Sequence, residues 1–583
     1  MDEGSWRHPP AAAVQGNHWR ALPVEGLDGD GAGERPRVSV VVPVRSVPGT
    51  LPWLLASLEE QRYPAERLEV LVVGWDGTTL PEGLAAPGGT PVVALSDPER
   101  AVPCIGAARN RGIAHATGEV IVLLGAHTVA HSDLVAAHAR WHAIARDLLV
   151  VGAVHRIASD ALGDADAPEA DLRALADDAD AEPIPWWEGL LEDTDDLTTP
   201  SADRLRAVLG ANLSVRRDHL HALGGLAELA LPTDTPETAA DGAHGSAGED
   251  EDVHDPTGSA SAVCVDLELG WRAIDAGTVV VPERAARVWT PRSGLHVGPP
   301  QPPSAAARVW LADRVPSPTL RPARVGRTLP VPRAVVDLDA TGADLEAVIA
   351  TVDAALTGET GDVAVRVRTD EGPAGRPLRE ALRDQPRVLL DDAALPPAPL
   401  TIALDAPIPM RHDSVQGLFE DLVVAERAGV LRLAAPITEA EDAPERTVLA
   451  WTQRAVRAGA RLAADRATTS DRDVAWSEVL RLAEERFGGG WESGSARGLG
   501  HGQDTRPAPV TEGQLDALQR AQQREARLEE RLRKRERRIR RLERELQEAR
   551  AQAEQAEEGL ARLEGRRVVR ALRRVDRLRR GDA

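Results

Sequence analysis

The sequence predicts an α/β fold, because short apolar runs alternate with segments of helical spacing. The β-branched run at 38–42 ends at Pro43, and the runs at 68–73 and 120–124 have the same buried-strand character. Leucines recur at helical spacing in the intervening segment 51–61. Strands that alternate with helices predict a parallel or mostly parallel sheet joined by right-handed crossovers.

The same pattern continues along the chain until acidic segments interrupt it. Residues 91–95 predict a further strand, and residues 105–115 predict a further helix. Residues 159–205 are acidic and rich in alanine, and residues 227–262 form an acidic insert that contains glycine and proline. Clustered acids can bind a divalent cation, but a charged run of this kind is more often a solvated loop.

Composition and charge limit the classes of function. The chain has 583 residues and a formal net charge of −23, which predicts several folding units and argues against nucleic acid as a partner. Its two cysteines form no disulfide framework and indicate a reducing compartment. No apolar run approaches the ~20 residues of a membrane span, and the first residues lack the layout of a signal peptide. The expected location is the cytoplasm.

Beyond a Pro-rich stretch the chain repeats the order of its first half. "RAVVDLDA" at 333–340 resembles the first strand, and "LTIALDAPIPMRHD" at 400–413 resembles "VIVLLGAHTVAHSD" at 120–133. "RAVRAG" at 454–459 resembles "RAIDAG" at 272–277. We interpret this order as an internal duplication with a shortened, degenerate second copy. Two unrelated α/β domains with the same Ala, Val and Arg bias are the alternative.

The C-terminal segment has a heptad pattern. The a and d positions from Leu518 onward are apolar over seven heptads, apart from Glu525 and Arg535. This pattern predicts a coiled coil that makes the chain a homodimer, and a lone solvated helix is the alternative. Residues 566–583 carry an apolar stripe between arginines. That stripe is typical of a basic amphipathic helix on an anionic membrane surface, and equally of a solvated end of the coil.

These observations divide the chain into seven predicted segments. They are a disordered N-terminus at 1–35, an α/β domain at 36–297, a Pro-rich linker at 298–332, a degenerate second α/β domain at 333–490, a linker at 491–511, a coiled coil at 512–565 and a basic amphipathic tail at 566–583.

Four segments in order carry a resemblance to a known family. They are "VSVVVPVRSVPGTLPWLLASLEEQRYP" from 38, "LEVLVVGWDGTT" from 68, "ARNRGIAHATGEVIVLL" from 108, and "GANLSVRRDHLHALGG" from 210 with "VDLELGWRAIDAG" from 265. Together they resemble the family 2 glycosyltransferases, which are inverting enzymes. The resemblance implies a GT-A-like (nucleotide-diphospho-sugar transferase, Rossmann-like) first domain, followed by the degenerate α/β domain and the coiled coil. It also implies a nucleotide-sugar donor.

The resemblance assigns roles to individual residues. Asp266 is the expected catalytic base, which takes the proton from the acceptor hydroxyl. The expected nucleotide-sugar contacts are Pro43, Asp76, Arg109, Asn110, Arg111, Gly125 and Ala126. Pro43 and Asp76 belong beside the nucleobase, and the run from Arg109 belongs beside the ribose and diphosphate. Trp75 replaces the first of two family aspartates, and Val265 replaces the glutamate before the base.

The family also implies a Mg²⁺ or Mn²⁺ ion, and here the chain departs from the pattern. The family's Leu-Asp-Ala-Asp turn is Leu124-Gly125-Ala126-His127 in this sequence, so both carboxylates are replaced. His127 is the one candidate metal ligand at the turn, although hard Mg²⁺ prefers oxygen. Thr290 and Pro291 stand where many members have a histidine ligand. The second copy keeps a single carboxylate, Asp405, at the equivalent turn.

Two functions remain open from the sequence. One is transfer of a sugar to a glycan or lipid-linked hydroxyl acceptor in the synthesis of bacterial cell-envelope polysaccharide or glycoconjugate. The chain is then expected in the cytoplasm or peripherally at the inner face of the plasma membrane. The alternative is a catalytically inactive relative that serves as a coiled-coil scaffold or glycan-binding protein. No Gln-x-x-Arg-Trp signature is present, which argues against a processive polysaccharide synthase.

Overall fold

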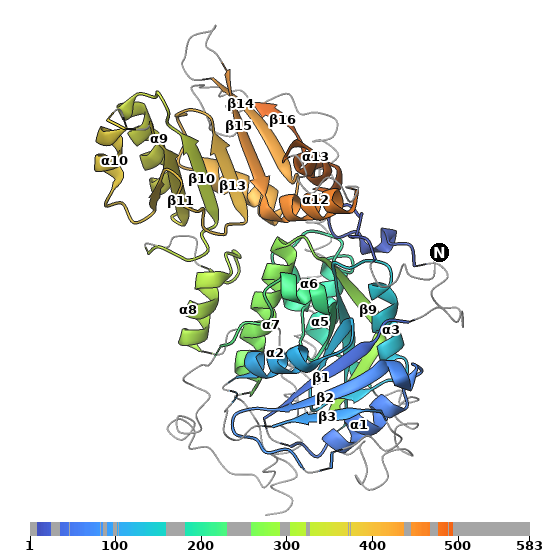
Figure 1. The fold of residues 1–583 in the computed structure, drawn as a ribbon. Helices are drawn as coiled ribbons and strands as arrows, with labels where there is room; N and C mark the ends of the chain where they lie inside the picture. The colour runs from blue at the N-terminus through green and yellow to red at the C-terminus, as the bar shows by residue number, and fades with distance from the viewer. Residues whose placement is uncertain are drawn as a thin grey trace, which may run out of the picture. The chain divides into compact units, whose positions relative to one another are not determined.

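In the computed structural model, the described part of the chain folds around two mixed β-sheets (Figure 1). The described residues are 9–24, 35–45, 47–81, 83–84, 90–96, 102, 104–158, 181–229, 258–291, 304–321, 327–370, 372–373, 375–436, 445–466, 476–487 and 489–493. The expected coiled coil at 512–565 and the basic tail at 566–583 lie outside these residues and stay predictions. No helix of the described residues is long and apolar enough to cross a membrane.

The first sheet confirms the predicted mixture of parallel strands and helices. Its strands are β1 (Val38–Val44), β2 (Leu68–Gly74), β3 (Val92–Leu95), β4 (Val120–Leu124), β5 (Val129–Ala130), β6 (Leu148–Ile157), β7 (Glu182–Pro183), β8 (Asn212–Arg216) and β9 (Val279–Pro291). Their order is β3-β2-β1-β4-β8-β6-β9-β5, with β7 paired to β6. The strands β1 to β4 pair in parallel, whereas β8 is antiparallel to both β4 and β6.

Helices cover this sheet, which explains why β1 and β4 are buried at every position. The helices of this half are α1 (Leu51–Glu59), α2 (Ile105–His115), α3 (Leu134–His142), α5 (Pro185–Asp193), α6 (Arg217–Ala222) and α7 (Gly258–Asp275), with the short η1 (Trp19–Ala21), η2 (Ala65–Arg67) and η3 (Arg204–Ala207). A side chain at Gly112 of α2 would lie 2.5 Å from Val41, so the glycine lets α2 pack directly on β1.

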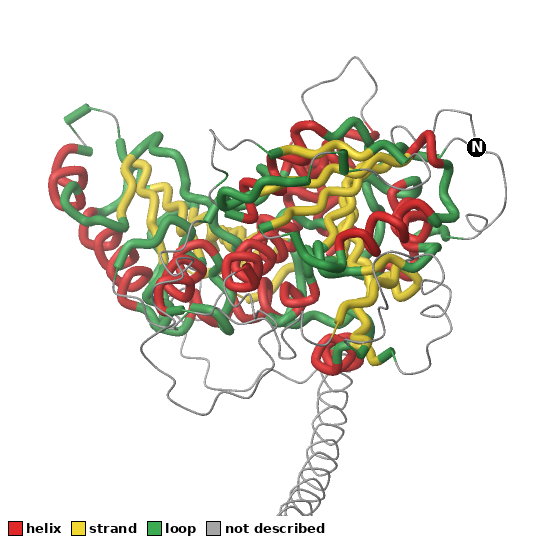
Figure 2. The backbone as a smooth tube through the Cα atoms, turned by 90° about the horizontal axis from the view of Figure 1, so that it is seen from below, coloured by secondary structure: helices red, strands yellow, loops and turns green. Residues whose placement is uncertain are grey.

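The second sheet has seven strands. They are β10 (Ala334–Asp339), β11 (Val363–Arg368), β12 (Val388–Leu390), β13 (Leu400–Leu404), β14 (Val430–Pro436), β15 (Glu445–Thr452) and β16 (Gly489–Ser493). Its helices are α9 (Leu345–Thr357), α10 (Arg376–Leu382), α11 (Ser414–Phe419), the π-helical turn η7 (Glu420–Val424), α12 (Gln453–Arg466) and α13 (Trp476–Phe487). Figure 2 shows helices in red beside the yellow strands of both sheets. The expected linker at 491–511 is wrong for its first three residues, which complete β16.

The strand order of the second sheet repeats that of the first. The order β12-β11-β10-β13-β15-β14-β16 matches β3-β2-β1-β4-β8-β6-β9 position by position. The antiparallel strand occupies the same place in both, since β15 lies antiparallel between β13 and β14. The last strand is parallel to its neighbour in both sheets. This agreement supports the predicted duplication.

One of the sequence pairings used for that prediction is wrong. "RAVRAG" lies in α12, which begins directly after β15, as α6 begins directly after β8. "RAIDAG" ends α7, the helix before β9, and the helix in that place of the second sheet is α13. Short Ala- and Arg-rich helical text recurs too easily in this chain to identify equivalent helices.

Two segments that were expected to lack structure are partly ordered. In the N-terminus, the Asn17 side chain donates to the carbonyls of Leu197 and Val280 and accepts from the Val280 amide. The expected disorder is therefore wrong for residues 9–24. In the Pro-rich linker, α8 (Ala305–Arg314) forms, and Arg321 is fully buried against Asp362. Composition alone does not predict the contacts of Asn17 and Arg321, because each depends on a buried partner that is distant in the sequence.

Candidate functional site

The predicted site residues gather at one edge of the first sheet. The strands β1, β2 and β4 run parallel, so their carboxyl ends share an edge, where ligands of open α/β sheets bind. Asp76 follows β2, and Gly125 follows β4. β8 runs the opposite way and pairs its first residue, Asn212, with Leu124, so the segment before β8 reaches the same edge.

At this edge Asp76 is held by a residue that the sequence analysis left without a role. Asp76 has a left-handed backbone (φ 56°), and its carboxylate accepts a 2.7 Å hydrogen bond from Arg45 Nε. The Arg45 guanidinium lies over the buried Trp75 ring, 5.4 Å from the ring centre. The sequence feature that could have identified Arg45 as a site residue is its position directly after β1. The Asp76 side chain remains 45% exposed, so one carboxylate oxygen stays accessible to a ligand.

Arg109 and Asp266, predicted for different roles, form an ion pair with each other. Arg109 Nη1 on α2 lies 2.7 Å from Asp266 Oδ1 on α7. The Gly210 amide donates to the other carboxylate oxygen at 2.8 Å. A side chain at Gly210 would overlap the Arg109 guanidinium, so the glycine allows the three groups to meet. Gly210 is a second contributor that carried no assigned role.

This ion pair is next to the turn after β4. The Gly125 amide donates to the carbonyl of Ala211, the residue after Gly210. Thr50, after β1, donates to the Ala126 carbonyl at 3.2 Å and joins that turn to the first loop. The structure therefore brings Arg109 and Asp266 into direct contact, and the consecutive residues Gly210 and Ala211 link this pair to the turn at Gly125. Asp76 lies at the same edge, after β2.

The buried Arg109 guanidinium has an N–H group that is not used in a hydrogen bond to the described residues. The residue is 3% exposed, and its Nε has no hydrogen-bond partner among the described residues. Buried donors of this kind are usually satisfied by water or by a ligand. Together with the half-exposed Asp76, this donor is the feature of the site that most directly suggests a bound polar ligand.

Three other predicted residues have different surroundings. The Asn110 side chain both donates to and accepts from the backbone of Leu226, which fixes that loop against α2. Arg111 is half-buried, and its guanidinium makes no ion pair within the described part of the chain. Pro43 does not end its strand: β1 continues to Val44, and Pro43 pairs in register with Val73. It lies beyond the β1–β4 pairing, where a missing N–H is tolerated.

The described residues at the turn after β4 do not fit the divalent ion that the family resemblance implies. The turn after β4 offers no carboxylate, and His127 is exposed. No group of three His, Cys, Asp or Glu side chains with metal-binding geometry occurs among the described residues. Thr290 is buried within β9 and supplies no imidazole. A reaction at this turn would therefore depend on the side chains of the protein for its charge stabilisation.

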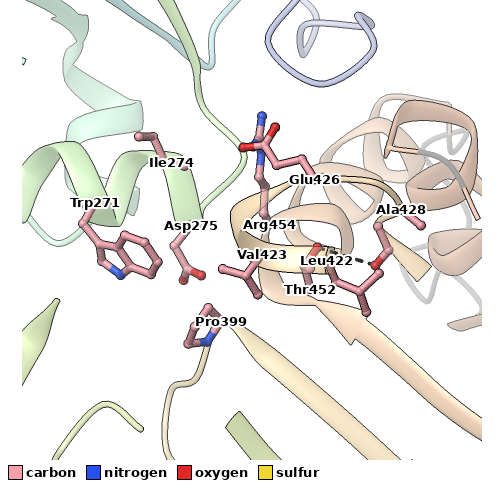
Figure 3. A pocket seen from close by; sticks show the side chains of 11 residues that line it. Trp271, Ile274, Asp275, Pro399, Leu422, Val423, Glu426, Ala428, Thr452 and Arg454 are labelled. Atoms are coloured by element: carbon pink, nitrogen blue, oxygen red, sulfur yellow. Dashed lines mark hydrogen bonds and ion pairs between the residues drawn. The ribbon is translucent and has the colours of Figure 1, made fainter. Parts of the chain in front are cut away.

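A small cavity lies away from this edge (Figure 3). It lies between the end of α7 and the second sheet, and its lining includes Trp271, Asp275, Pro399, Glu426, Thr452 and Arg454. A cavity volume of about 40 Å³ has room for a few water molecules. It does not contain the predicted catalytic residues.

The architecture of the first sheet agrees with a known class of fold. The mixed sheet, with its parallel first strands and an antiparallel strand beside β4, is consistent with a GT-A-like fold. No family model matches the chain, and no curated protein matches it.

Solved structures that share a likeness with this chain are glycosyltransferases. Mannosyltransferase PcManGT from Pyrobaculum calidifontis, in complex with GDP-Man and Mn²⁺, is 18% identical over 54% of this chain and 67% of its own, with a TM-score of 0.26. GalNAc-T7 with UDP, GalNAc and Mn²⁺ is 13% identical over 48% of each chain, with a TM-score of 0.30. TarS (1–349) of S. aureus is 13% identical over 44% of this chain and 60% of its own, with a TM-score of 0.28. The chain spans about half to two thirds of these proteins, and TM-scores this low identify no activity.

Proposed function

We propose that the chain is a glycosyltransferase that moves a sugar from a nucleoside-diphosphate sugar to a hydroxyl acceptor without a metal at the turn after β4. The observation that carries this proposal is the Asp266 carboxylate, fixed at the carboxyl edge by Arg109 and the Gly210 amide. Its side chain is 12% exposed. Each of its oxygens accepts one of these contacts and retains a further lone pair for an acceptor hydroxyl.

In the proposed reaction the acceptor oxygen forms a bond to the anomeric carbon while the bond from that carbon to the diphosphate breaks. The hydroxyl proton passes to Asp266, and the electron pair of the broken bond leaves with the diphosphate. Inversion follows because the acceptor attacks from the face opposite the leaving group.

The leaving charge requires cations at the carboxyl edge. Arg216 is not available for this purpose: it pairs in register with Val120, at the opposite end of β4, and donates to the His142 carbonyl. Arg109 is the better candidate, since its Nε has no partner among the described residues. A diphosphate that binds this group would share Arg109 with Asp266 and weaken the ion pair. Donor binding would thereby release the base.

Donor binding without metal is the direct test. We expect one of UDP-, GDP- or dTDP-sugars to raise the unfolding temperature of the full chain in EDTA, with no further rise in Mn²⁺. Arg109→Gln should abolish that shift. Arg62→Gln, which removes an exposed arginine that pairs with Asp133, should leave it unchanged. A shift that requires Mn²⁺ would contradict the metal-free site.

The second candidate function is a non-catalytic one, and the closed ion pair favours it. If Arg109 and Asp266 stay paired when the donor binds, the base is never released and the chain only binds a nucleotide sugar or a glycan. Donor binding with no transfer to any acceptor, and with equal affinity in Asp266→Asn, would establish this function. Absence of binding to all three donor classes would instead favour the scaffold. Envelope synthesis, the coiled-coil homodimer and contact with an anionic membrane remain part of the proposal in either case.

A further inference from the structure

The helix that carries Asp266 also carries a second buried carboxylate. Asp275 ends α7, nine residues after Asp266, which is about 13 Å along a helix. Its side chain is 15% exposed and lies 3.1 Å from Arg457 of α12. The far end of the site helix is thus in contact with the second α/β region.

A stronger contact reaches the site from Glu426. Its side chain is 12% exposed and pairs with both Arg204 and Arg454, which are themselves buried. Burial alone would raise the pKa of Glu426, but the two guanidinium groups lower it below its ordinary value. Glu426 also has a left-handed backbone (φ 50°). A non-glycine residue keeps that conformation only where its surroundings determine it.

Arg204 connects Glu426 to the carboxyl edge of the first sheet, where Asp266 lies. It is the first residue of η3, and six residues later the Gly210 amide binds Asp266. η3 rests directly on α7, because a side chain at Gly270 would lie 2.5 Å from the Leu205 carbonyl. Movement of Arg204 would therefore displace the Gly210 amide, which is one of the two groups bound to the Asp266 carboxylate, and α7, the helix that carries Asp266.

The middle of α12 makes a second contact with the first sheet, close to the same end of α7. Arg461 pairs with the fully buried Asp147 at 3.1 Å and donates to the Gly277 carbonyl at 3.0 Å. Figure 3 shows Asp275 and Trp271 from α7 facing Glu426 and Arg454 around the small cavity. The cavity is therefore part of this contact.

We propose that residues 420–429 and α12 form a clamp that positions Asp266, with Glu426 as its central positioning residue. The clamp itself rests on contacts that exist without substrate, and only the catalytic meaning of Asp266 rests on the proposed function. In this proposal the second α/β region has lost a complete site of its own, and its contacts position Asp266 in the first region.

Hydrogen–deuterium exchange of the full chain tests the clamp without any substrate. Glu426→Gln keeps size and shape and removes the charge. We expect exchange to rise at least about tenfold in peptides that cover 205–212 and 263–275, since a buried arginine loses its partner. Peptides that cover β1 and β2 should not change. Glu484→Gln is the matched control, because Glu484 of α13 pairs with Arg432 of β14 within the second α/β region, and it should alter exchange only near its own contact.

A second set of variants separates the clamp from a local role of Glu426. If Glu426 acts through Arg204, the double variant Arg204→Gln/Glu426→Gln should show no more exchange at 205–212 than Glu426→Gln alone. Arg457→Gln, at a 41% exposed side chain, is less disruptive and should loosen 266–275 even if Glu426→Gln fails to fold. Faster exchange confined to 420–430 and 450–458 would overturn the clamp. Exchange at 205–212 that rises in a chain that binds no donor would support the clamp while refuting the proposed function.

Discussion

Arg109 and Asp266 lie 157 residues apart and form a 2.7 Å ion pair between α2 and α7. The two partners differ in burial, with side-chain exposures of 3% and 12%. Loss of one partner therefore leaves an unpaired charge that is almost fully buried in one case and slightly more exposed in the other. The two single substitutions should have unequal effects on stability.

Asp266→Asn should destabilise the fold more than Arg109→Gln does. It leaves the Arg109 charge unpaired at 3% exposure, and loss of one partner of a buried pair costs about 3–5 kcal/mol. Arg109→Gln leaves the carboxylate with the Gly210 amide and partial access to water, so its cost should be smaller. Urea unfolding at pH 7 measures both. The double variant should be more stable than Asp266→Asn; if it is less stable, the pair is not the source of the effect.

The turn after β4 should accept a metal site by substitution. A side chain at Gly125 would meet Thr128 and Ala211 at 3.4–3.5 Å, which is ordinary contact. Gly125→Asp with His127→Asp should therefore fold and restore the two carboxylates of the family turn. We expect the variant to bind Mn²⁺ in isothermal titration calorimetry, whereas the wild type shows no binding there. Equal Mn²⁺ binding by both chains would mean that a metal site lies elsewhere.

The alternation of strands and helices in the first sheet was predictable, because β1, β2 and β4 are mostly apolar and are buried at nearly every position, with Ser39 and Glu69 as the polar exceptions. The position of β8 was not. It is antiparallel and lies between β4 and β6, although β6 precedes it in the chain. Pairing between segments distant in sequence leaves no local pattern, so the order of the sheet required the structure.

The positions of the candidate residues on the sheet follow from the sequence pattern, whereas the interactions among them do not. Asp76, Arg109, Gly125 and Asp266 do lie at one edge. The family resemblance assigns Arg109 to the ribose and diphosphate and Asp266 to the acceptor hydroxyl, and nothing in either motif indicates that the two side chains pair. Gly210 and Arg45 were missed for the same reason, since a glycine before a strand and an arginine after one acquire a role only from their partners.

Asp275 should lower stability at neutral pH through its own charge. Burial raises its pKa to about 6, against the opposing effect of Arg457 and Arg454. Because the folded-state pKa lies above the unfolded value of about 3.8, the protonated carboxyl group stabilises the fold below pH 3.8. This stabilisation is lost as pH rises through 6. Asp275→Asn should thus gain about 2 kcal/mol relative to the wild type between pH 4 and pH 7. Unfolding free energies of both chains at both pH values test this prediction. It is refuted if the stability of the variant relative to the wild type falls as pH rises.

The buried histidines of the first domain should make the fold sensitive to acid. His138 Nε2 faces Asn212 Oδ1, and Ser214 lies 2.8 Å from both His138 Nδ1 and His142 Nε2. The Asn212 amide nitrogen donates to two carbonyls, so its oxygen accepts from His138. His138 Nδ1 then accepts from Ser214, and no nitrogen of this neutral ring is left to take a proton without breaking a hydrogen bond.

Desolvation lowers the pKa of His138 to about 4, and His142 is shifted in the same direction. The unfolded chain, with histidine near 6.5, therefore binds more protons between pH 6.5 and pH 4, and stability falls as pH falls through that window. His138 alone accounts for about 3 kcal/mol. His138→Gln should cost stability at pH 7 and flatten the pH dependence by about one proton, measured as the slope of the unfolding free energy against pH. His412→Gln, at a 74% exposed side chain, is the control and should keep the wild-type slope; an unchanged slope in His138→Gln would show that the acid sensitivity has another source.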